Sequence, residues 1–134
     1  MRKYRKRCMM RILGVDPGTA IVGYSIVDYE KGKYEIKDYG CIYTHKDEDM
    51  PHRLEKIYNE LETLIKLWKP NDMAIEELFF FKNQKTVIKV GQARGVIMVC
   101  GQKNNLDIFS YTPLQVKMGV AGYGRADKAQ IQEM

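Results

Sequence analysis

The chain has 134 residues, of which 45% are hydrophobic, so it can bury one compact core but not two ordinary domains. Its 22 Lys and Arg outnumber its 17 Asp and Glu, and the net charge of +5 favours a polyanionic partner such as nucleic acid or a membrane surface. No stretch is apolar for long enough to span a bilayer or to form a signal peptide, so we expect a soluble, cytoplasmic protein with no membrane partner.

Residues 1–9 form a basic N-terminal extension, and residues 10–134 form the expected domain. The positive charges near the start are Arg2, Lys3, Arg5, Lys6, Arg7 and Arg11. Runs of like charge are usually solvated, and we interpret this arm as a solvated tail.

Three strands are predicted at the front of the domain. The first starts at Met10 and ends at Asp16-Pro17-Gly18, a sequence that stops a strand and turns the chain. Residues 21–29 and 33–43 are rich in Ile, Val and Tyr, and a short polar link with Gly32 separates them. This spacing predicts an antiparallel hairpin. We interpret the tyrosines of these strands as sheet packing.

A helix follows from Pro51 to Trp68. Its apolar residues recur every three or four positions: Leu54, Ile57, Tyr58, Leu61, Leu64, Ile65 and Trp68. Lys69-Pro70-Asn71 ends this helix, because the residue before proline disfavours helical geometry. Residues 72–76 then predict a short buried strand that ends on an acid.

The second half of the chain predicts a helix over 84–103, a strand over 107–111, and further helices from Leu114 and from Arg125 or Ala126. Gly91 and Gly95 lie four residues apart in the helix 84–103, which allows close approach to a sheet face or to a second copy of the chain. The resulting order is β-β-β-α-β-α-β-α. It predicts an α/β fold with a mixed sheet flanked by helices.

Two acids carry the predicted chemistry. Asp16 and Glu76 each end a buried strand, a placement that suits oxygen ligands for magnesium. Paired magnesium ions can activate water and stabilise the leaving oxygen in phosphodiester cleavage. Plain alternatives are turn chemistry at Asp16 and an exposed strand end at Glu76. A sharper alternative is the phosphate loop of actin-like ATPases, which Gly-Val-Asp-Pro-Gly-Thr resembles, although those enzymes need a second, similar half.

The segment after Glu76 combines aromatic and basic residues. Phe79, Phe80 and Lys82 lie here, and rings that stack on bases beside a phosphate-binding lysine would suit DNA opening. The alternative is packing of the rings under a loop.

Three more basic residues surround a glycine-rich segment near the end of the chain. Lys117 precedes it, and Arg125 and Lys128 lie at an expected helix start, where phosphate oxygens bind favourably. The alternative for any of these residues is ordinary solvation. The cysteines at 8, 41 and 100 and the two histidines have no metal-ligand spacing, which fits a reducing compartment.

An ordered set of motifs now gives a family resemblance. These motifs are Arg-Ile-Leu-Gly-Val-Asp-Pro-Gly-Thr-Ala from Arg11, Ala-Ile-Glu-Glu-Leu-Phe-Phe from Ala74, Gly-Gln-Ala-Arg-Gly-Val from Gly91, Gln-Val-Lys from Gln115 and Gly-Tyr-Gly-Arg-Ala-Asp-Lys from Gly122. With them the chain resembles the RuvC family of Holliday-junction resolvases.

The resemblance implies an RNase H-like fold and a homodimer that nicks two like strands of four-way junction DNA. It implies two magnesium ions per active site, with manganese as a substitute, and it matches Asp16 and Glu76 to two of four family metal ligands. Phe79 and Phe80 match its junction-probing aromatics, Lys117 and Lys128 match its phosphate contacts, and residues 91–96 match its dimer helix. The family also implies a branch-migration helicase partner.

The chain departs from the family at both ends. Residues 1–9 precede the usual start, and the last helix, with the other two acidic ligands, is absent. We therefore expect this chain to bind junctions weakly and to cleave them poorly or not at all. A non-catalytic junction-binding module and an RNase H-like nuclease acting on RNA remain alternatives.

Overall fold

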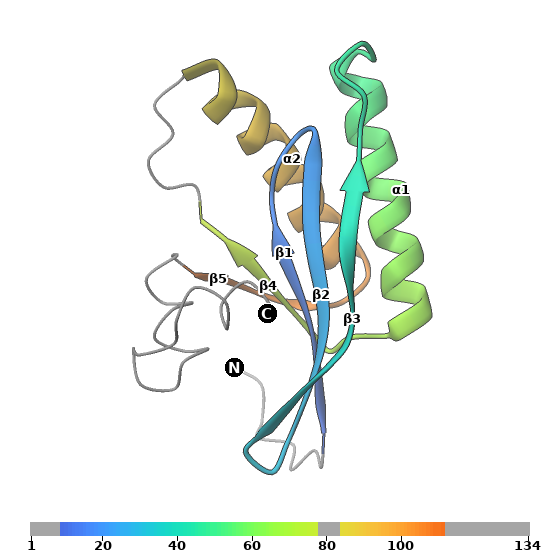
Figure 1. The fold of residues 1–134 in the computed structure, drawn as a ribbon, viewed down its shortest axis with the longest axis vertical. Helices are drawn as coiled ribbons and strands as arrows, with labels where there is room; N and C mark the ends of the chain where they lie inside the picture. The colour runs from blue at the N-terminus through green and yellow to red at the C-terminus, as the bar shows by residue number, and fades with distance from the viewer. Residues whose placement is uncertain (1–8, 78–83, 112–134) are drawn as a thin grey trace.

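The computed structural model describes residues 9–77 and 84–111 as a mixed sheet with two helices (Figure 1). The strands are β1 (Met10–Asp16), β2 (Ile21–Glu30), β3 (Lys33–Tyr43), β4 (Asp72–Glu76) and β5 (Asp107–Tyr111), and the helices are α1 (Met50–Trp68) and α2 (Gln84–Lys103). Every element predicted within these ranges is confirmed. The helices predicted from Leu114 and from Arg125 or Ala126 lie outside the described residues.

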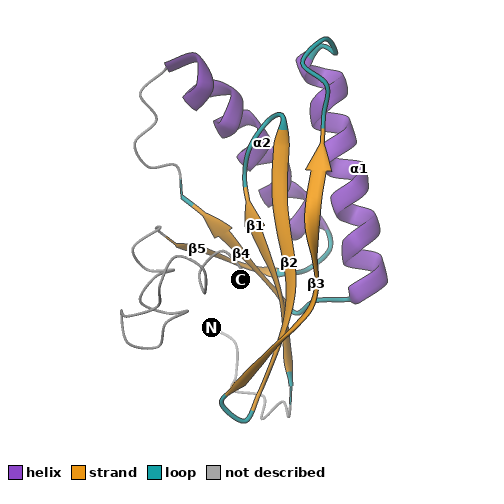
Figure 2. Cartoon of the chain, in the orientation of Figure 1, coloured by secondary structure: helices purple, strands orange, loops and turns teal. Residues whose placement is uncertain are grey.

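The five strands lie in the order β3-β2-β1-β4-β5, with β1 at the centre (Figure 2). β1 pairs antiparallel with β2, and β2 pairs antiparallel with β3. On its other side β1 runs parallel to β4, which in turn runs parallel to β5. The predicted mixed sheet with three antiparallel strands is confirmed, and its parallel half brings the carboxyl ends of β1, β4 and β5 to one edge.

The turn between β2 and β3 consists of Lys31 and Gly32. Both residues have positive φ, 50° and 78° respectively. Two consecutive positive values are what a type I′ turn needs, and such a turn matches the twist of the strands it joins. The predicted hairpin is therefore set by local backbone chemistry.

Helix α1 is capped at both ends. The Asp49 side chain accepts a hydrogen bond from the backbone N–H of His52 at 3.0 Å, and Pro51 occupies the first turn. At the other end Lys69 takes the left-handed conformation, with φ at 50°, and its N–H donates to the Ile65 carbonyl at 2.8 Å. These caps explain why the helix begins and ends where the sequence predicts.

The hydrophobic core lies between the helices and one face of the sheet. Alternate residues of β1, Leu13 and Val15, are fully buried there. The remaining core side chains come from the other strands, from both helices and from the link between α2 and β5: Val22, Ile26, Ile42, Ile57, Leu61, Ile65, Met73, Ile75, Ala93, Ile97, Cys100 and Leu106. The other alternate set of β1 residues, which includes Gly14 and Asp16, lies on the opposite face. Among the described residues no helix covers that face (Figure 1).

The prediction that Arg11 belongs to a solvated basic arm is wrong, because its side chain is held within the fold. Its guanidinium is paired with Asp28 and also donates to the Trp68 carbonyl at 2.9 Å. Its backbone exchanges hydrogen bonds with Asn71. Arg11 therefore ties β1 to β2 and to the segment that follows α1, and residues 1–8 lie outside the described part of the chain.

Of the two contacts predicted for the glycine-bearing side of α2, the sheet contact is not made by Gly95. Gly95 is exposed, as are Ile88 (61%) and Val99 (60%) of the same helix, and the contact with a second copy of the chain stays a prediction. The sheet side of α2 consists instead of Val90, Ala93, Ile97, Cys100 and Gly101. The interpretation of the strand tyrosines as sheet packing is confirmed in part. Tyr24 packs against the core, and the Tyr34 ring lies 4.8 Å from the Tyr29 ring across the hairpin, whereas Tyr39 and Tyr43 of the edge strand β3 are 74% and 60% exposed.

Candidate active site

Two carboxylates meet at the carboxyl edge of the parallel strands. Asp16 is the last residue of β1, and Glu76 is the last residue of β4. The residues immediately before them, Val15 and Ile75, are register partners in the parallel pair. Side chains alternate along strands, so Asp16 and Glu76 lie next to each other on the face away from the helices. The predicted convergence of the two side chains is thus found in the structure.

The electrostatics of Glu76 reflect this closeness. Its pKa is raised to about 7, first by burial, then by a hydrogen bond with Asp16 and by the negative charge of Asp16. Two carboxyl groups that share a hydrogen bond cannot both ionise easily. A bound cation would relieve that repulsion.

Tyr111 is a third member of the site that sequence reasoning missed. It ends β5 and is the register partner of Glu76. Burial, followed by the charges of Glu76 and Asp16, raises the pKa of its phenol to about 12. Tyr111 therefore places a neutral phenol beside the two acids. The sequence signal that could have found Tyr111 is its position at the end of a third parallel strand, because the carboxyl ends of parallel strands lie at the same edge of the sheet.

The loop after Asp16 is held from the α1 side of the molecule. Thr44 donates its hydroxyl to the Thr19 carbonyl, and its N–H bonds the Ala20 carbonyl at 3.0 Å. Arg53, a buried residue of α1, donates Nε to the Thr44 hydroxyl at 2.9 Å. A side chain at Gly18 could not be accommodated, because its Cβ would collide with the Ile21 carbonyl. These contacts fix the turn that presents Asp16.

Space beside Asp16 is kept open by a glycine. Gly23 is the register partner of Asp16 in β2, and a Cβ built on Gly23 would lie 3.6 Å from the Asp16 Cβ. A larger side chain at position 23 would therefore grow across the carboxylate. The absence of one leaves the acid accessible from this side.

The donor set fits a hard divalent cation in type and placement. Carboxylate oxygens are preferred magnesium ligands, and rigid strand ends hold this pair. In the described ranges, however, no group of three or more His, Cys, Asp or Glu is gathered in one place. Asp16 and Glu76 are the two carboxylates that the described residues bring together at this edge.

The other predicted site residues are not placed by the structure. Phe79, Phe80, Lys82, Lys117, Arg125 and Lys128 lie outside the described residues. His45 and His52 are exposed, and each has a ring nitrogen 3.4 Å from a carboxylate, that of Asp47 and Glu48 respectively.

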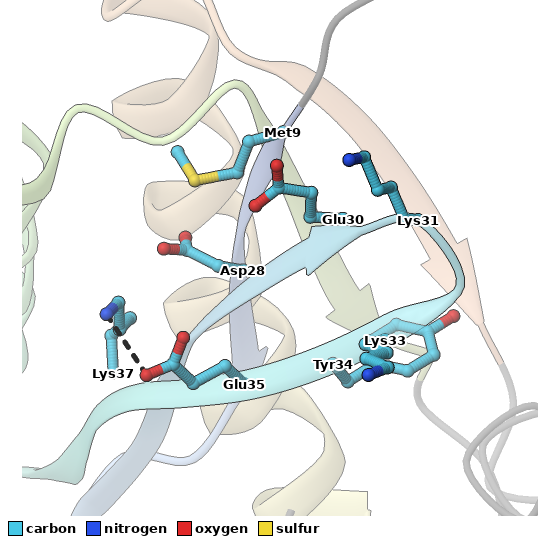
Figure 3. A pocket seen from close by; sticks show the side chains of 8 residues that line it. All are labelled: Met9, Asp28, Glu30, Lys31, Lys33, Tyr34, Glu35 and Lys37. Carbon is cyan, nitrogen blue, oxygen red and sulfur yellow. Dashed lines mark hydrogen bonds and ion pairs between the residues drawn. The ribbon is translucent and has the colours of Figure 1, made fainter.

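A separate cavity of about 570 Å³ lies by the β2–β3 hairpin (Figure 3). Met9 contributes to it, so it lies at the opposite end of β1 from Asp16. Three acids and three lysines line it, and Lys37 pairs with Glu35 at 3.2 Å. Its balanced charge gives no preference for a polyanion, and it is distinct from the acid pair.

Comparison with known proteins defines the class to which this fold and acid pair belong. The model described as "Crossover junction endodeoxyribonuclease RuvC" matches residues 12–134. A protein of that name from Fusobacterium nucleatum is 59% identical over 93% of this chain and 66% of its own length, and one from Alkaliphilus oremlandii is 54% identical over 93% and 76%. The chain thus spans about two thirds to three quarters of these curated relatives.

Solved structures agree. The structure titled "T. thermophilus RuvC in complex with Holliday junction substrate" is similar to this chain with a TM-score of 0.83 and 28% identity, over 91% of this chain and 74% of that one. The yeast mitochondrial Holliday junction resolvase Ydc2, at 16% identity and a TM-score of 0.68 over 92% of this chain and 60% of its own, shares the fold.

The mixed sheet with acids at its parallel edge is that of the RNase H-like nucleases, so the predicted fold class is confirmed. Within that class, the chain belongs to the RuvC family of crossover junction endodeoxyribonucleases. This membership confirms the family resemblance and favours the nuclease interpretation over an ATPase-like phosphate loop.

Proposed function

We propose that the complete gene product resolves Holliday junctions by nicking two like strands symmetrically, in DNA recombination and repair. The observation that carries this proposal is the convergence of Asp16 and Glu76 at the end of two parallel strands in a chain of this family. The similarity to a RuvC solved with a Holliday junction substrate supports four-way junction DNA as the partner.

Asp16 and Glu76 are the proposed metal ligands, for Mg²⁺ with Mn²⁺ as a substitute. When bound, two such ions would activate water and stabilise the leaving oxygen of the cut strand. The protein's own contribution is positional. The β1–β4 register sets the spacing of the carboxylates, Gly23 leaves access beside Asp16, and Tyr111 places a neutral phenol next to both.

The proposed DNA contacts come from residues outside the described ranges. Phe79, Phe80 and Lys82 directly follow the strand that ends at Glu76, so stacking and phosphate contacts there would lie close in sequence to the acids. Lys117, Arg125 and Lys128 are proposed to bind the phosphate backbone.

Helix α2 is the proposed surface for a homodimer. Ile88, Gly95 and Val99 recur at helical spacing, two of them are more than half exposed, and a Cβ at Gly95 would meet nothing within 4 Å. A branch-migration helicase is the proposed further partner.

Neither of the described helices has the length and apolar character needed to cross a membrane. Cys41 and Cys100 are free thiols, which fits the reducing cytoplasm that we propose as the location.

The decisive experiment incubates the complete gene product and Mg²⁺ with a labelled four-way junction, a linear DNA duplex and an RNA–DNA hybrid. Paired nicks in the junction, with little cutting of the other substrates, are expected. Binding without nicking would favour the non-catalytic module, and preferred cutting of the hybrid would favour an RNA-directed nuclease.

A further inference from the structure

Arg94 of α2 connects three groups behind the acid pair. Its Nε donates to the main-chain carbonyl of Glu76 at 3.3 Å, and one terminal nitrogen donates to the Ser110 hydroxyl at 2.7 Å. The other terminal nitrogen lies 3.2 Å from the Met98 sulfur, one helical turn further along α2. A single half-buried guanidinium thus joins the ends of β4 and β5 to the helix.

These contacts lie at the level of the acids but on the other side of the sheet. Glu76 and Tyr111 are register partners, and Ser110 directly precedes Tyr111. Because side chains alternate, the Ser110 hydroxyl points toward α2 while the Tyr111 ring and the Glu76 carboxylate point away from it. Arg94 therefore reaches the main chain of Glu76 and does not compete for its carboxylate.

The end of β4 needs such support. β1 stops at Asp16, and the next residue is Pro17, which has no N–H to donate to a neighbouring strand. On the β5 side the Glu77 N–H donates to the Tyr111 carbonyl at 2.7 Å, but the strand itself ends at Glu76. The Arg94 bond to the Glu76 carbonyl has a charged donor, although at 3.3 Å it is long, and the bond of the same guanidinium to Ser110 is short at 2.7 Å.

We propose that Arg94 is a positioning residue, which fixes the backbone of Glu76 and thereby the distance of its carboxylate from Asp16. The inference deepens the proposed function and rests on it for its consequence, a shared divalent cation. The contact of Arg94 with Glu76 and Ser110 has a separate consequence that needs no cation, the rigidity of the β4–β5 edge. The two consequences can be measured independently.

The planar fork of arginine is what spans the two strands. A lysine keeps the charge but has one nitrogen, so it can reach the Glu76 carbonyl or the Ser110 hydroxyl and cannot hold both in the same geometry. Arg94→Lys should consequently restore only part of what Arg94→Met loses. Ser110→Ala, which removes one of the partners and little volume, should produce a smaller loss of the same kind.

The experiment uses the complete gene product in four variants: Arg94→Met, Arg94→Lys, Ser110→Ala and, as a matched control, Lys89→Met, which removes an exposed cation from the same helix. Hydrogen exchange of the Glu77 amide is measured without metal, and Mn²⁺ binding is measured by calorimetry without DNA. In Arg94→Met we expect exchange to be faster by about tenfold and Mn²⁺ binding to be weaker by about tenfold, as for removal of an outer-shell partner of a metal ligand. Unfolding in urea reports global stability.

The proposal would be overturned if, in Arg94→Met, the Glu77 amide exchanged at the wild-type rate and Mn²⁺ bound with the wild-type affinity. If Arg94→Met does not fold, Ser110→Ala decides on the same two readouts, and no change in either overturns it. Failure of the unmodified protein to bind Mn²⁺ would contradict the proposed function instead. In that case the exchange measurement alone still decides whether Arg94 positions Glu76.

Discussion

The guanidinium of Arg11 donates two hydrogen bonds to the carboxylate of Asp28, from Nε to Oδ1 at 2.7 Å and from a terminal nitrogen to Oδ2 at 2.9 Å. The two residues are register partners on β1 and β2, and Asp28 is buried. The same guanidinium lies 5.3 Å from the centre of the Trp68 ring. This bidentate ion pair joins β1 to β2. The contact of the same guanidinium with the Trp68 ring joins β1 to the end of α1.

Stability should depend on pH through this pair. The hydrogen bond from Arg11 lowers the pKa of Asp28 in the folded protein, so its stabilisation is complete above the ordinary carboxyl value of about 4 and is lost as the pH falls through the lowered value. Asp28→Asn should reduce the free energy of unfolding by about 1 to 3 kcal/mol at pH 7. Urea unfolding between pH 7 and pH 2 measures this.

The gap between the unmodified protein and Asp28→Asn should close toward low pH. Glu60→Gln, on the exposed side of α1, serves as the control and should give no such gap. A gap of constant size across the whole range would show that the ion pair is not its source.

Asp16→Asn in the complete gene product should abolish junction cutting while leaving junction binding nearly unchanged. The substitution removes a proposed metal ligand without removing a proposed DNA contact, and the nicking rate should fall by about a thousandfold or more. Nicking in Mg²⁺ and gel-shift titration in Ca²⁺ measure the two properties separately. An equal loss of binding would argue against a metal-ligand role.

Charge reversal at Lys117 or Lys128 should weaken junction binding and flatten its salt dependence. Each phosphate contact releases condensed counterions, so the slope of log K against log salt should fall by about 1 per lost contact. Affinities at several salt concentrations provide the slope. Lys89→Glu, which reverses a charge on the described helix α2, is the control. An unchanged slope for Lys117→Glu or Lys128→Glu would remove the proposed backbone role.

Val99→Lys should dissociate the proposed homodimer. Val99 is 60% exposed on α2, and a charge buried without a partner in an interface is strongly unfavourable. Leu67→Lys on α1 is a close control, because Leu67 is 70% exposed and equally apolar. Sedimentation equilibrium should give a dissociation constant raised by about a hundredfold or more for Val99→Lys alone. Equal effects of both substitutions would place the interface elsewhere.

Local patterns explain how much of the fold could be predicted. The apolar spacing of Leu61 and Ile65, the proline at 51 and the glycine at 32 each act within a few residues, and the elements they predict are present. Strand ends that carry acids were also visible, which is why Asp16 and Glu76 could be paired before the sheet order was known.

Long-range partners explain what could not be predicted. Arg11 looked like one more charge in a basic run, because Asp28 and Trp68 lie 17 and 57 residues away in sequence. In the sequence Arg94 stands out only as part of a family motif, because its partners Glu76 and Ser110 are brought to it by the pairing of β4 with β5. The sequence left open which side of α2 meets the sheet, because the buried Ala93, Cys100 and Gly101 carry a weaker apolar signal than the exposed Ile88 and Val99.

Because β1 and β4 are aligned in parallel, the pairing of the Asp16 and Glu76 carboxylates depends on the exact number of residues in β1. Adding one residue to β1 just before Asp16 would turn that carboxylate through the sheet toward the hydrophobic core, since alternate residues of a strand occupy opposite sides. Glu76 would then have no acidic neighbour from β1. An insertion of one amino acid, harmless in a surface loop, should therefore be as damaging here as loss of the acid itself.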